Sequence, residues 1–237
     1  MIASRLAKRL QYYDLSSYAQ YYQLIKQAEY KHEFQVMVDI LTTNETYFFR
    51  EPQHFEFLRD QVLKPWQGDH FKAWSAASSS GEEAYSLAIV LAETLGNKHW
   101  DVLGSDISTR MLDKAGNGVY LMDRLENMDK KLLDKYCLRG VRSQEGFFWI
   151  NEKLRRRTRF EQINLVKPLS PALKQNFDVI FLRNVLIYFD QETKKAVASR
   201  VAETLKPGGY FFISHSENLH QITDHLKMVT PSIFIKK

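Results

Sequence analysis

The sequence predicts an α/β protein whose mostly parallel sheet is covered by helices on both faces. Strand-like apolar runs alternate with helical runs from about residue 70 to the C-terminus, which is typical of parallel sheets. Residues 2–41 have a helical pattern throughout and indicate a separate helical unit in front of the sheet. Between residues 120 and 164 the alternation stops, which predicts an insertion into the sheet domain.

The chain has 237 residues, 44% of them hydrophobic and 26% charged, enough for one large domain and a small one. No apolar run approaches the ~20 residues of a membrane span, and the N-terminus lacks a signal-peptide core. We therefore expect a cytoplasmic protein without membrane insertion, and we expect a monomer. The net charge of +5 indicates an acidic partner, which nucleic acid, an anionic membrane or an acidic protein surface would satisfy. The single cysteine, Cys137, excludes a cysteine-based zinc cluster, and we expect no metal site.

The helical unit divides into runs that are separated by a polar break around residues 14–17. In its first helix Arg5, Lys8 and Arg9 recur at helical spacing and share one face. Such a stripe is either a solvated helix face or a basic surface for an acidic partner. Further along, Pro52 is well placed to begin a short helix that extends to about residue 63.

The α/β part follows in a regular order, with strands expected at residues 71–77, 100–107, 159–165, 177–184, 210–214 and 228–237. Helices are expected between most of them, with Ser108 as the N-cap of one and Asp190 as the N-cap of another. The sequence KPGG, residues 206–209, predicts a turn into the strand that follows. Pro231 predicts a bend or an edge position in the last strand.

The insertion is expected at about residues 134–160, where Gly140 and Gly146 punctuate short strand-like pieces of an antiparallel sheet. Its run RRRTR, residues 155–159, predicts an exposed strand edge that is protected by charge. The alternative is a docking strip that adds a partner's tail as an extra strand.

Ligands of open α/β sheets bind beyond the carboxyl ends of the strands, where three loops of this chain carry polar residues. The loop ASSSGEE holds one glycine, Gly81, instead of the G-x-G-x-x-G set, which disfavours a dinucleotide. Asp106 ends the next strand at about the spacing of a carboxylate that binds ribose hydroxyls, or it only caps the following helix. Together they favour a nucleoside without pyrophosphate, such as S-adenosylmethionine (SAM). The third loop, LRNVLIYFD, places Arg183, Asn184 and Tyr188 after a strongly apolar strand.

Five segments in this order resemble the CheR-type chemoreceptor glutamate methyltransferases: LTTNETYFFREPQHF, WSAASSSGEEAYSLA, SDIS, FDVIFLRNVLIYFD and LKPGGYFFISHSEN. The resemblance covers essentially the whole chain. It implies a Rossmann-like SAM-dependent methyltransferase that forms γ-glutamyl methyl esters on the signalling helices of chemoreceptors. It also implies a small N-terminal helical domain, residues 1–41, which begins here at the family's second helix. A methyltransferase domain, residues 42–237, with an inserted β-subdomain would follow.

The resemblance further implies roles for individual residues. The SAM contacts of the family fall on Asn44, Thr46, Arg50, Glu83, Asp106, Asn164, Leu165, Arg183 and Asn184. The basic recognition helix of the family falls on Arg5, Lys8 and Arg9, while Gln11 stands where a basic residue is usual. Arg142 stands where some members have a glycine, in the subdomain with which those members dock on a receptor's C-terminal pentapeptide.

The stretch TTNETYFFRE then has a chemical interpretation. A glutamate carboxylate is already ionised at neutral pH, because its reference pKa is about 4.3, so methyl transfer to it needs no strong general base. The enzyme must position and partly desolvate that carboxylate, and the guanidinium of Arg50 can hold its two oxygens in a fixed geometry. Tyr47, Phe48 and Phe49 would wall the pocket and orient Arg50, or they are simply core residues. The resemblance places Tyr188 near the methyl group, so Arg50 and Tyr188 are the candidate catalytic residues.

Two alternatives use the same cofactor pocket. A nucleic-acid methyltransferase would suit the basic charge, but the chain lacks an Asn/Asp-Pro-Pro-aromatic motif and a Pro-Cys nucleophile, and we expect no nucleic-acid partner. A non-catalytic adaptor that binds SAM or receptor would not need Arg50, Asp106 and Tyr188 together.

Overall fold

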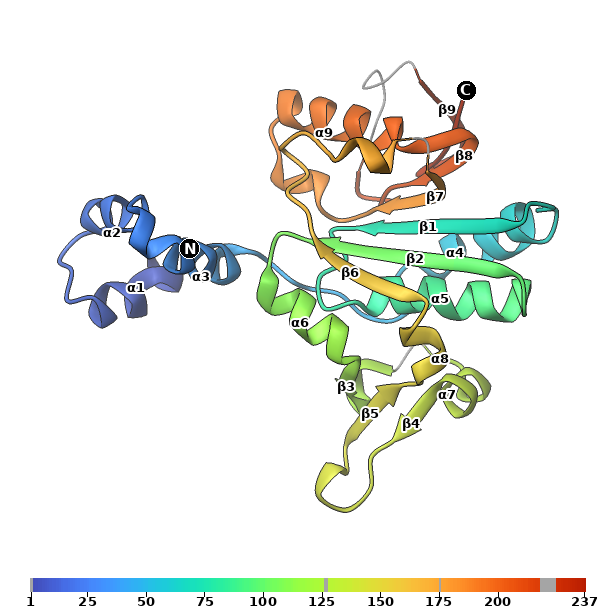
Figure 1. Cartoon of the computed structure of the whole chain (residues 1–237), viewed down its shortest axis with the longest axis horizontal. Helices are drawn as coiled ribbons and strands as arrows, with labels where there is room; N and C mark the ends of the chain where they lie inside the picture. Colours follow the sequence, from blue (N-terminus) through green and yellow to red (C-terminus); the bar gives the residue numbers. More distant parts are fainter. Residues whose placement is uncertain (1, 126–127, 175, 218–224) are drawn as a thin grey trace.

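The computed structural model of the chain describes residues 2–125, 128–174, 176–217 and 225–237. Within these residues one seven-stranded sheet has the order β6-β2-β1-β7-β8-β10-β9, and a small three-stranded sheet has the order β3-β5-β4 (Figure 1). The strands of the large sheet are β1 (His70–Ala76), β2 (His99–Asp106), β6 (Thr158–Gln162), β7 (Phe177–Leu182), β8 (Leu205–Phe212), β9 (Leu226–Thr230) and β10 (Ile233–Lys236).

The large sheet is mostly parallel, as predicted. β6, β2, β1, β7 and β8 run parallel to one another, and β10 is antiparallel to β8 and to β9. The chain builds outward from β1 through β2 to β6 and then returns to the other side of β1 with β7. This reversal of direction leaves a crevice at the carboxyl ends of β1, β2 and β7, which is where ligands of such sheets bind.

The helices of the described residues are α1 (Ile2–Tyr12), α2 (Tyr18–Ile25), α3 (Lys31–Leu41), α4 (Pro52–Phe57), α5 (Glu82–Leu95), α6 (Thr109–Asn117), α7 (Lys130–Tyr136), α8 (Glu152–Arg155) and α9 (Gln191–Glu203). α4 begins at Pro52 as predicted and continues as a π-helical turn, η2 (Leu58–Leu63). Both predicted N-caps are confirmed. The Ser108 hydroxyl accepts a hydrogen bond from the backbone N–H of Met111, and the Asp190 carboxylate accepts one from that of Thr193.

Helices cover both faces of the large sheet, and each face has its own core (Figure 1). Side chains alternate along the central strands, so Ala73 and Phe181 belong to the core under α4 and α5. Trp74 and Ile180 belong to the core under α9. Because both faces are buried, the central strands are apolar almost throughout, which is why their sequences are strongly hydrophobic. No helix among the described residues is long and apolar enough to cross a membrane.

The small sheet consists of β3 (Val119–Leu121), β4 (Cys137–Arg139) and β5 (Phe147–Ile150), and its strands are antiparallel. The predicted antiparallel insertion is therefore present, but its first strand precedes the expected residues 134–160. Sequence reasoning missed β3 because three residues directly after a helix are too few to show a strand pattern.

Three local expectations were wrong in detail. Residues 206–209 do not form a turn before a strand; they lie within β8 as an irregularity in its pairing with β7. The C-terminal segment forms two strands, β9 and β10, with the predicted bend at Pro231 between them. Arg155 ends α8, and Thr158 and Arg159 begin β6. The charged strand edge that was expected in the insertion therefore belongs to β6, an edge strand of the large sheet.

Helices α1 to α3 form a cluster beside the large sheet, which α1 and α2 extend away from (Figure 1). Residues 42–51 connect the cluster to the sheet domain, and α3 also contacts that domain through hydrogen bonds of Gln35 with Gln162 and Ile107. The small apolar core of the cluster contains Leu6, Leu10, Tyr21 and Ile25. A buried polar network lies beside this core, centred on Glu33, whose exposed fraction is 4%. The Glu33 carboxylate pairs with Arg9 and also accepts hydrogen bonds from the hydroxyls of Tyr13 (3.1 Å) and Tyr21 (2.6 Å).

The Glu33 network makes the helical cluster sensitive to acid. Burial by itself would raise the pKa of Glu33, but the hydrogen bonds from Arg9, Tyr21 and Tyr13 outweigh it and hold the pKa below its usual value. A carboxyl whose pKa is lowered by folding stabilises the fold above its unfolded pKa. That contribution disappears as the pH falls through the folded pKa.

We therefore expect Glu33→Gln to lower the free energy of unfolding at pH 7 by about 1–3 kcal/mol, because a paired buried charge is lost. The difference from wild type should begin to shrink as the pH falls below the unfolded pKa of about 4.3, and it should vanish only below the lowered pKa of folded Glu33. Denaturant unfolding followed by circular dichroism at pH 7 and pH 3 measures both effects. The exposed Glu29→Gln is the matched control, and a Glu33→Gln deficit of equal size at both pH values would contradict the prediction.

Candidate active site

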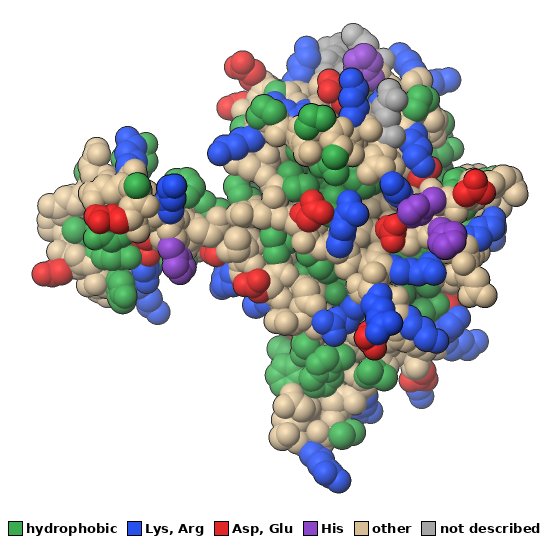
Figure 2. Space-filling model, in the orientation of Figure 1, with side chains coloured by type: hydrophobic (Ala, Val, Ile, Leu, Met, Phe, Trp, Pro, Cys, Tyr) green, Lys and Arg blue, Asp and Glu red, His purple; other side chains and the backbone are tan. Residues whose placement is uncertain are grey.

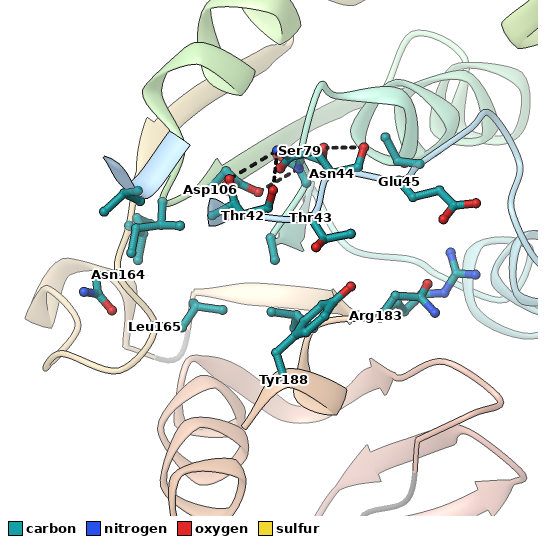
Figure 3. A pocket seen from close by; sticks show the side chains of 18 of the residues that line it. Thr42, Thr43, Asn44, Glu45, Ser79, Asp106, Asn164, Leu165, Arg183 and Tyr188 are labelled. Atoms are coloured by element: carbon teal, nitrogen blue, oxygen red, sulfur yellow. Dashed lines mark hydrogen bonds between the residues drawn. The ribbon is translucent and has the colours of Figure 1, made fainter. Parts of the chain in front are cut away.

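A cavity of about 420 Å³ opens at the carboxyl ends of β1, β2, β6 and β7. It lies in the crevice that the strand order creates, and the extended segment after α3 forms one of its walls (Figure 3). The structure brings together in this lining all the residues predicted for cofactor binding or catalysis: Asn44, Thr46, Arg50, Glu83, Asp106, Asn164, Leu165, Arg183, Asn184 and Tyr188.

Asp106 connects the loops that follow β1 and β2. Its carboxylate accepts hydrogen bonds from the backbone N–H groups of Ser79 and Ser108, each at 2.9 Å. Burial raises the pKa of Asp106, and these backbone donors act against that rise. Asp106 thus orders the two loops, whereas the N-cap of α6 is Ser108, so the simpler interpretation of Asp106 as a helix cap does not hold. Because each carboxylate oxygen has two lone pairs, the same group can also accept hydrogen bonds from a ligand.

Arg183 is the buried centre of the site, with 1% of its side chain exposed. One of its terminal nitrogens donates to Glu83 at 2.9 Å, and the other donates to the backbone carbonyl of Arg50 at 2.7 Å. The second nitrogen also lies 3.2 Å from a carboxylate oxygen of Glu51. Burial raises the pKa of Glu83, and the charge of Arg183 opposes that rise. The network joins β7, α5 and the segment before α4 below the cavity.

The loops around the cavity hold an unusual backbone conformation. Phe49 and Glu51, on either side of Arg50, have positive φ angles of 54° and 56°. Ala77, Ser79 and Asn184 also have positive φ angles and line the cavity. Each such residue costs about 1–3 kcal/mol and persists only where its surroundings enforce it. The backbone of Arg50 is therefore held in place by its neighbours, independently of its side chain.

The three aromatic residues before Arg50 have separate roles. Phe48 is fully buried and packs against Tyr120 and Phe148, and the Phe49 ring packs on Phe55. Of the two interpretations left open by the sequence, core packing holds for Phe48 and Phe49, and neither residue lines the cavity.

Tyr47 alone is beside Arg50. It is 36% exposed, and its ring centroid lies 5.5 Å from the guanidinium carbon of Arg50. The Arg50 side chain also donates a hydrogen bond to the carbonyl of Glu45 at 3.0 Å. These two contacts give the guanidinium a defined place at the edge of the cavity.

Tyr188 belongs to the short helical turn η6 (Leu186–Tyr188) after β7 and is 58% exposed. Its ring extends into the cavity from the side opposite Thr43 (Figure 3). Sequence reasoning did not single out Glu217, which fixes this loop. The Glu217 carboxylate accepts hydrogen bonds from the backbone N–H groups of Asn184, Leu186 and Ser214. Asn218, the last residue of the quoted motif, lies outside the described residues.

The sequence also did not indicate the apolar wall of the cavity, formed by Met37, Val38, Leu41, Ile107, Ile163, Val185 and Phe189. Three of these residues come from α3, so the helical cluster contributes directly to the pocket. α3 is held against α6 by hydrogen bonds from Gln35 to the carbonyl of Ile107 and from Thr109 to Asp39. Helical periodicity in α3 gave no sign of this contact.

The predicted basic face of α1 is only partly available. Arg9 is paired with the buried Glu33, and Arg5 donates to the carbonyls of Leu41 and Thr42. Lys8 is exposed. Figure 2 shows separate basic groups on the helical cluster, interspersed with acidic ones, and a denser gathering of Lys and Arg side chains over α8 and the adjoining end of β6.

The parallel sheet, the acidic residue at the end of β2 and the glycine-poor loop after β1 are typical of Rossmann-like SAM-dependent methyltransferases. Residues 44–235 match the SAM-binding domain of the CheR methyltransferases, and residues 1–42 match the all-alpha domain of the same proteins. The chain belongs to the CheR methyltransferase family, and SAM is its cofactor.

Relatives named chemotaxis protein methyltransferase match most of the chain. The protein of Escherichia coli K12 is 38% identical over 224 residues, which are 94% of this chain and 77% of the relative. Chemotaxis protein methyltransferase 2 of Pseudomonas aeruginosa is 38% identical over 237 residues, with 99% and 84% covered. The protein of Borreliella burgdorferi is 32% identical over 247 residues, with 100% and 86% covered. The predicted family is therefore confirmed, and a nucleic-acid methyltransferase is not favoured.

Proposed function

We propose that the protein transfers a methyl group from SAM to glutamate side chains on the cytoplasmic signalling helices of chemoreceptors. The products are γ-glutamyl methyl esters and S-adenosylhomocysteine. The observation that carries this proposal is the position of Arg50, a guanidinium held at the edge of the SAM cavity by Glu45 and Tyr47. The names of the relatives support a substrate in chemotaxis.

The chemistry required of the protein is modest. SAM supplies a methyl group on a positively charged sulfur, and a glutamate oxygen forms the new C–O bond as the C–S bond breaks. No proton has to be removed, because the glutamate is ionised at neutral pH. In agreement with this, no histidine, lysine or cysteine is found among the described residues that line the cavity. Arg50 would position the carboxylate, and the ring of Tyr188 would close the site beside the methyl group.

For the cofactor, we propose that the nine lining residues predicted from the sequence bind SAM. Asp106 would accept hydrogen bonds from the ribose hydroxyls with the lone pairs left free by Ser79 and Ser108. The apolar wall from α3 and Ile107 suits a flat purine ring. Glu83 supplies negative charge near the amino-acid part of the ligand, balanced by Arg183.

For the partner, we propose that an acidic receptor helix meets α1 and the mouth of the cavity. Lys8 supplies exposed charge on α1, whereas Arg5 and Arg9 act mainly within the helical cluster. At the mouth, Ile187 and Tyr188 are about half exposed and offer an apolar contact beside the proposed carboxylate site. The proposal also includes a cytoplasmic location and a monomeric state. It further includes docking of a receptor tail on the small β-sheet.

The function is tested by incubating the full chain with tritiated SAM and membranes from bacteria that express methyl-accepting chemoreceptors. We expect label on the receptor that is released by mild alkali as methanol, because carboxyl methyl esters hydrolyse under these conditions. Isolated DNA and RNA serve as alternative acceptors in parallel reactions. Alkali-stable label on the receptor, or label on nucleic acid alone, would show that the proposed reaction is wrong.

We expect Asp106→Asn to weaken SAM and S-adenosylhomocysteine binding about ten- to a hundredfold, since it removes one acceptor for the ribose hydroxyls. Isothermal titration calorimetry measures the affinity, and thermal unfolding without ligand measures the effect on the loops. Asp113→Asn, an exposed change on α6, the helix that follows Asp106 in the chain, is the control. Lower thermal stability with unchanged affinity would mean that Asp106 only organises the loops.

We expect Arg50→Lys and Tyr188→Ala to lower kcat about a hundredfold while SAM affinity changes much less, because positioning of the substrate is lost. Lysine keeps the charge of Arg50 but cannot hold two carboxylate oxygens in a plane. Receptor methylation at saturating SAM gives kcat, and calorimetry gives the affinity. Arg59→Lys, on the surface and paired with Asp60, should behave as wild type. Wild-type kcat in both site variants would remove them from the active site.

A further inference from the structure

A cluster of two histidines and a glutamate lies next to the cavity but outside its lining. One possible ligand atom each from Glu51, His54 and His215 lies within 4.8 Å of the others. Glu51 directly precedes α4, His54 is in the first turn of α4, and His215 follows β8. His54 is 1% exposed, whereas the side chain of His215 is 50% exposed, so the cluster is buried on one side and open on the other.

The hydroxyl of Ser232 fixes the orientation of both rings. Its oxygen lies 2.7 Å from Nε2 of His54 and 3.2 Å from Nδ1 of His215, and its hydrogen is donated to the carbonyl of Pro231. A hydroxyl has one hydrogen, so while Ser232 donates to the Pro231 carbonyl its oxygen can accept a hydrogen bond from each ring. In that tautomer the protons are on Nε2 of His54 and Nδ1 of His215, and the other two ring nitrogens carry lone pairs.

These two lone pairs face the same carboxylate oxygen. Nδ1 of His54 lies 3.3 Å from Oε2 of Glu51, and Nε2 of His215 lies 3.9 Å from it. Nδ1 of His54 is buried and has no hydrogen-bond partner. One possible ligand atom from each of the three residues thus lies within 4.8 Å of the others, and an unpartnered buried donor or acceptor is costly unless a ligand satisfies it.

We propose that Glu51, His54 and His215 bind a divalent transition-metal ion of the Zn²⁺ type. Two neutral imidazoles and one carboxylate form a known ligand set for such ions, and the open side beside His215 leaves room for a water as fourth ligand. Ligating histidines almost always donate their other N–H to a fixed acceptor, which is the part that Ser232 plays here. The half-exposed His215 ring can close the distance to the bond length that Zn²⁺ needs.

The charges around the cluster are compatible with a cation. Glu51 also pairs with Arg183, whose positive charge opposes metal binding. That charge is balanced by the second carboxylate on the same guanidinium, Glu83. The ion would join the loop after β8 to the start of α4, next to Arg50. Its role would be to hold the loop after β8 against the start of α4. This inference does not depend on which substrate is methylated.

The test is Zn²⁺ binding to the metal-free full chain, measured by isothermal titration calorimetry, with the Co²⁺ absorption spectrum as a second measurement. We expect one site per chain and a higher melting temperature with Zn²⁺. His215→Gln should weaken binding at least tenfold, and its half-exposed position makes the change tolerable for folding. Ser232→Gly, which suits the positive φ at this position, should weaken binding about 10- to 100-fold while all three ligands remain.

His70→Gln is the matched control, because His70 is a surface histidine that pairs with Asp101 at 2.6 Å elsewhere on the molecule. It should bind Zn²⁺ as wild type does. The proposal is overturned if wild type binds no Zn²⁺ or if His215→Gln binds as tightly as wild type. It is also overturned if His70→Gln loses as much affinity as His215→Gln, which would indicate binding to surface histidines.

Discussion

The site depends on the buried guanidinium of Arg183. Its two terminal nitrogens donate to Glu83 and to the carbonyl of Arg50 and lie beside Glu51, whereas its buried Nε has no hydrogen-bond partner. Removing one partner of such a buried charge is strongly destabilising. These partners come from α5 and from the segment before α4, while Arg183 directly follows β7. One charged group thus fixes the relative positions of three elements that form the floor of the SAM cavity.

This network helps explain how the strained backbone next to it is maintained. Positive φ angles at Phe49 and Glu51 are unfavourable on their own. The N–H of Phe49 donates to the hydroxyl of Ser86, and Glu51 accepts a hydrogen bond from Ser214. Together with the bond from Arg183 to the Arg50 carbonyl, these contacts fix the chain on both sides of Arg50. The side chain that we propose to position the substrate therefore starts from a backbone that hydrogen bonds hold on both sides.

Glu51 lies between Arg183 and the His54–His215 pair, which belong to different sequence motifs. It faces Arg183 on one side and the His54–His215 pair on the other. A cation at the histidine pair would therefore act on the same carboxylate that helps hold Arg183. The apolar contribution of α3 and the loop anchored by Glu217 complete the walls around this centre. Among the described residues the cavity is thus lined by the end of α3 with the segment after it, and by the loops that follow β1, β2, β6 and β7.

The sequence by itself determined the alternation of strands and helices, the caps at Ser108 and Asp190, the family, and the polar residues that line the cavity. The elements and caps follow from local periodicity, and the polar residues follow from the family's motifs, most of them at strand ends, which a parallel sheet necessarily gathers at one edge. Only the tertiary structure decided that Phe48 and Phe49 enter the core, that Arg9 pairs with Glu33, and that His54 meets His215. Such contacts join residues far apart in the chain, and they depend on how elements pack rather than on the local pattern of either segment.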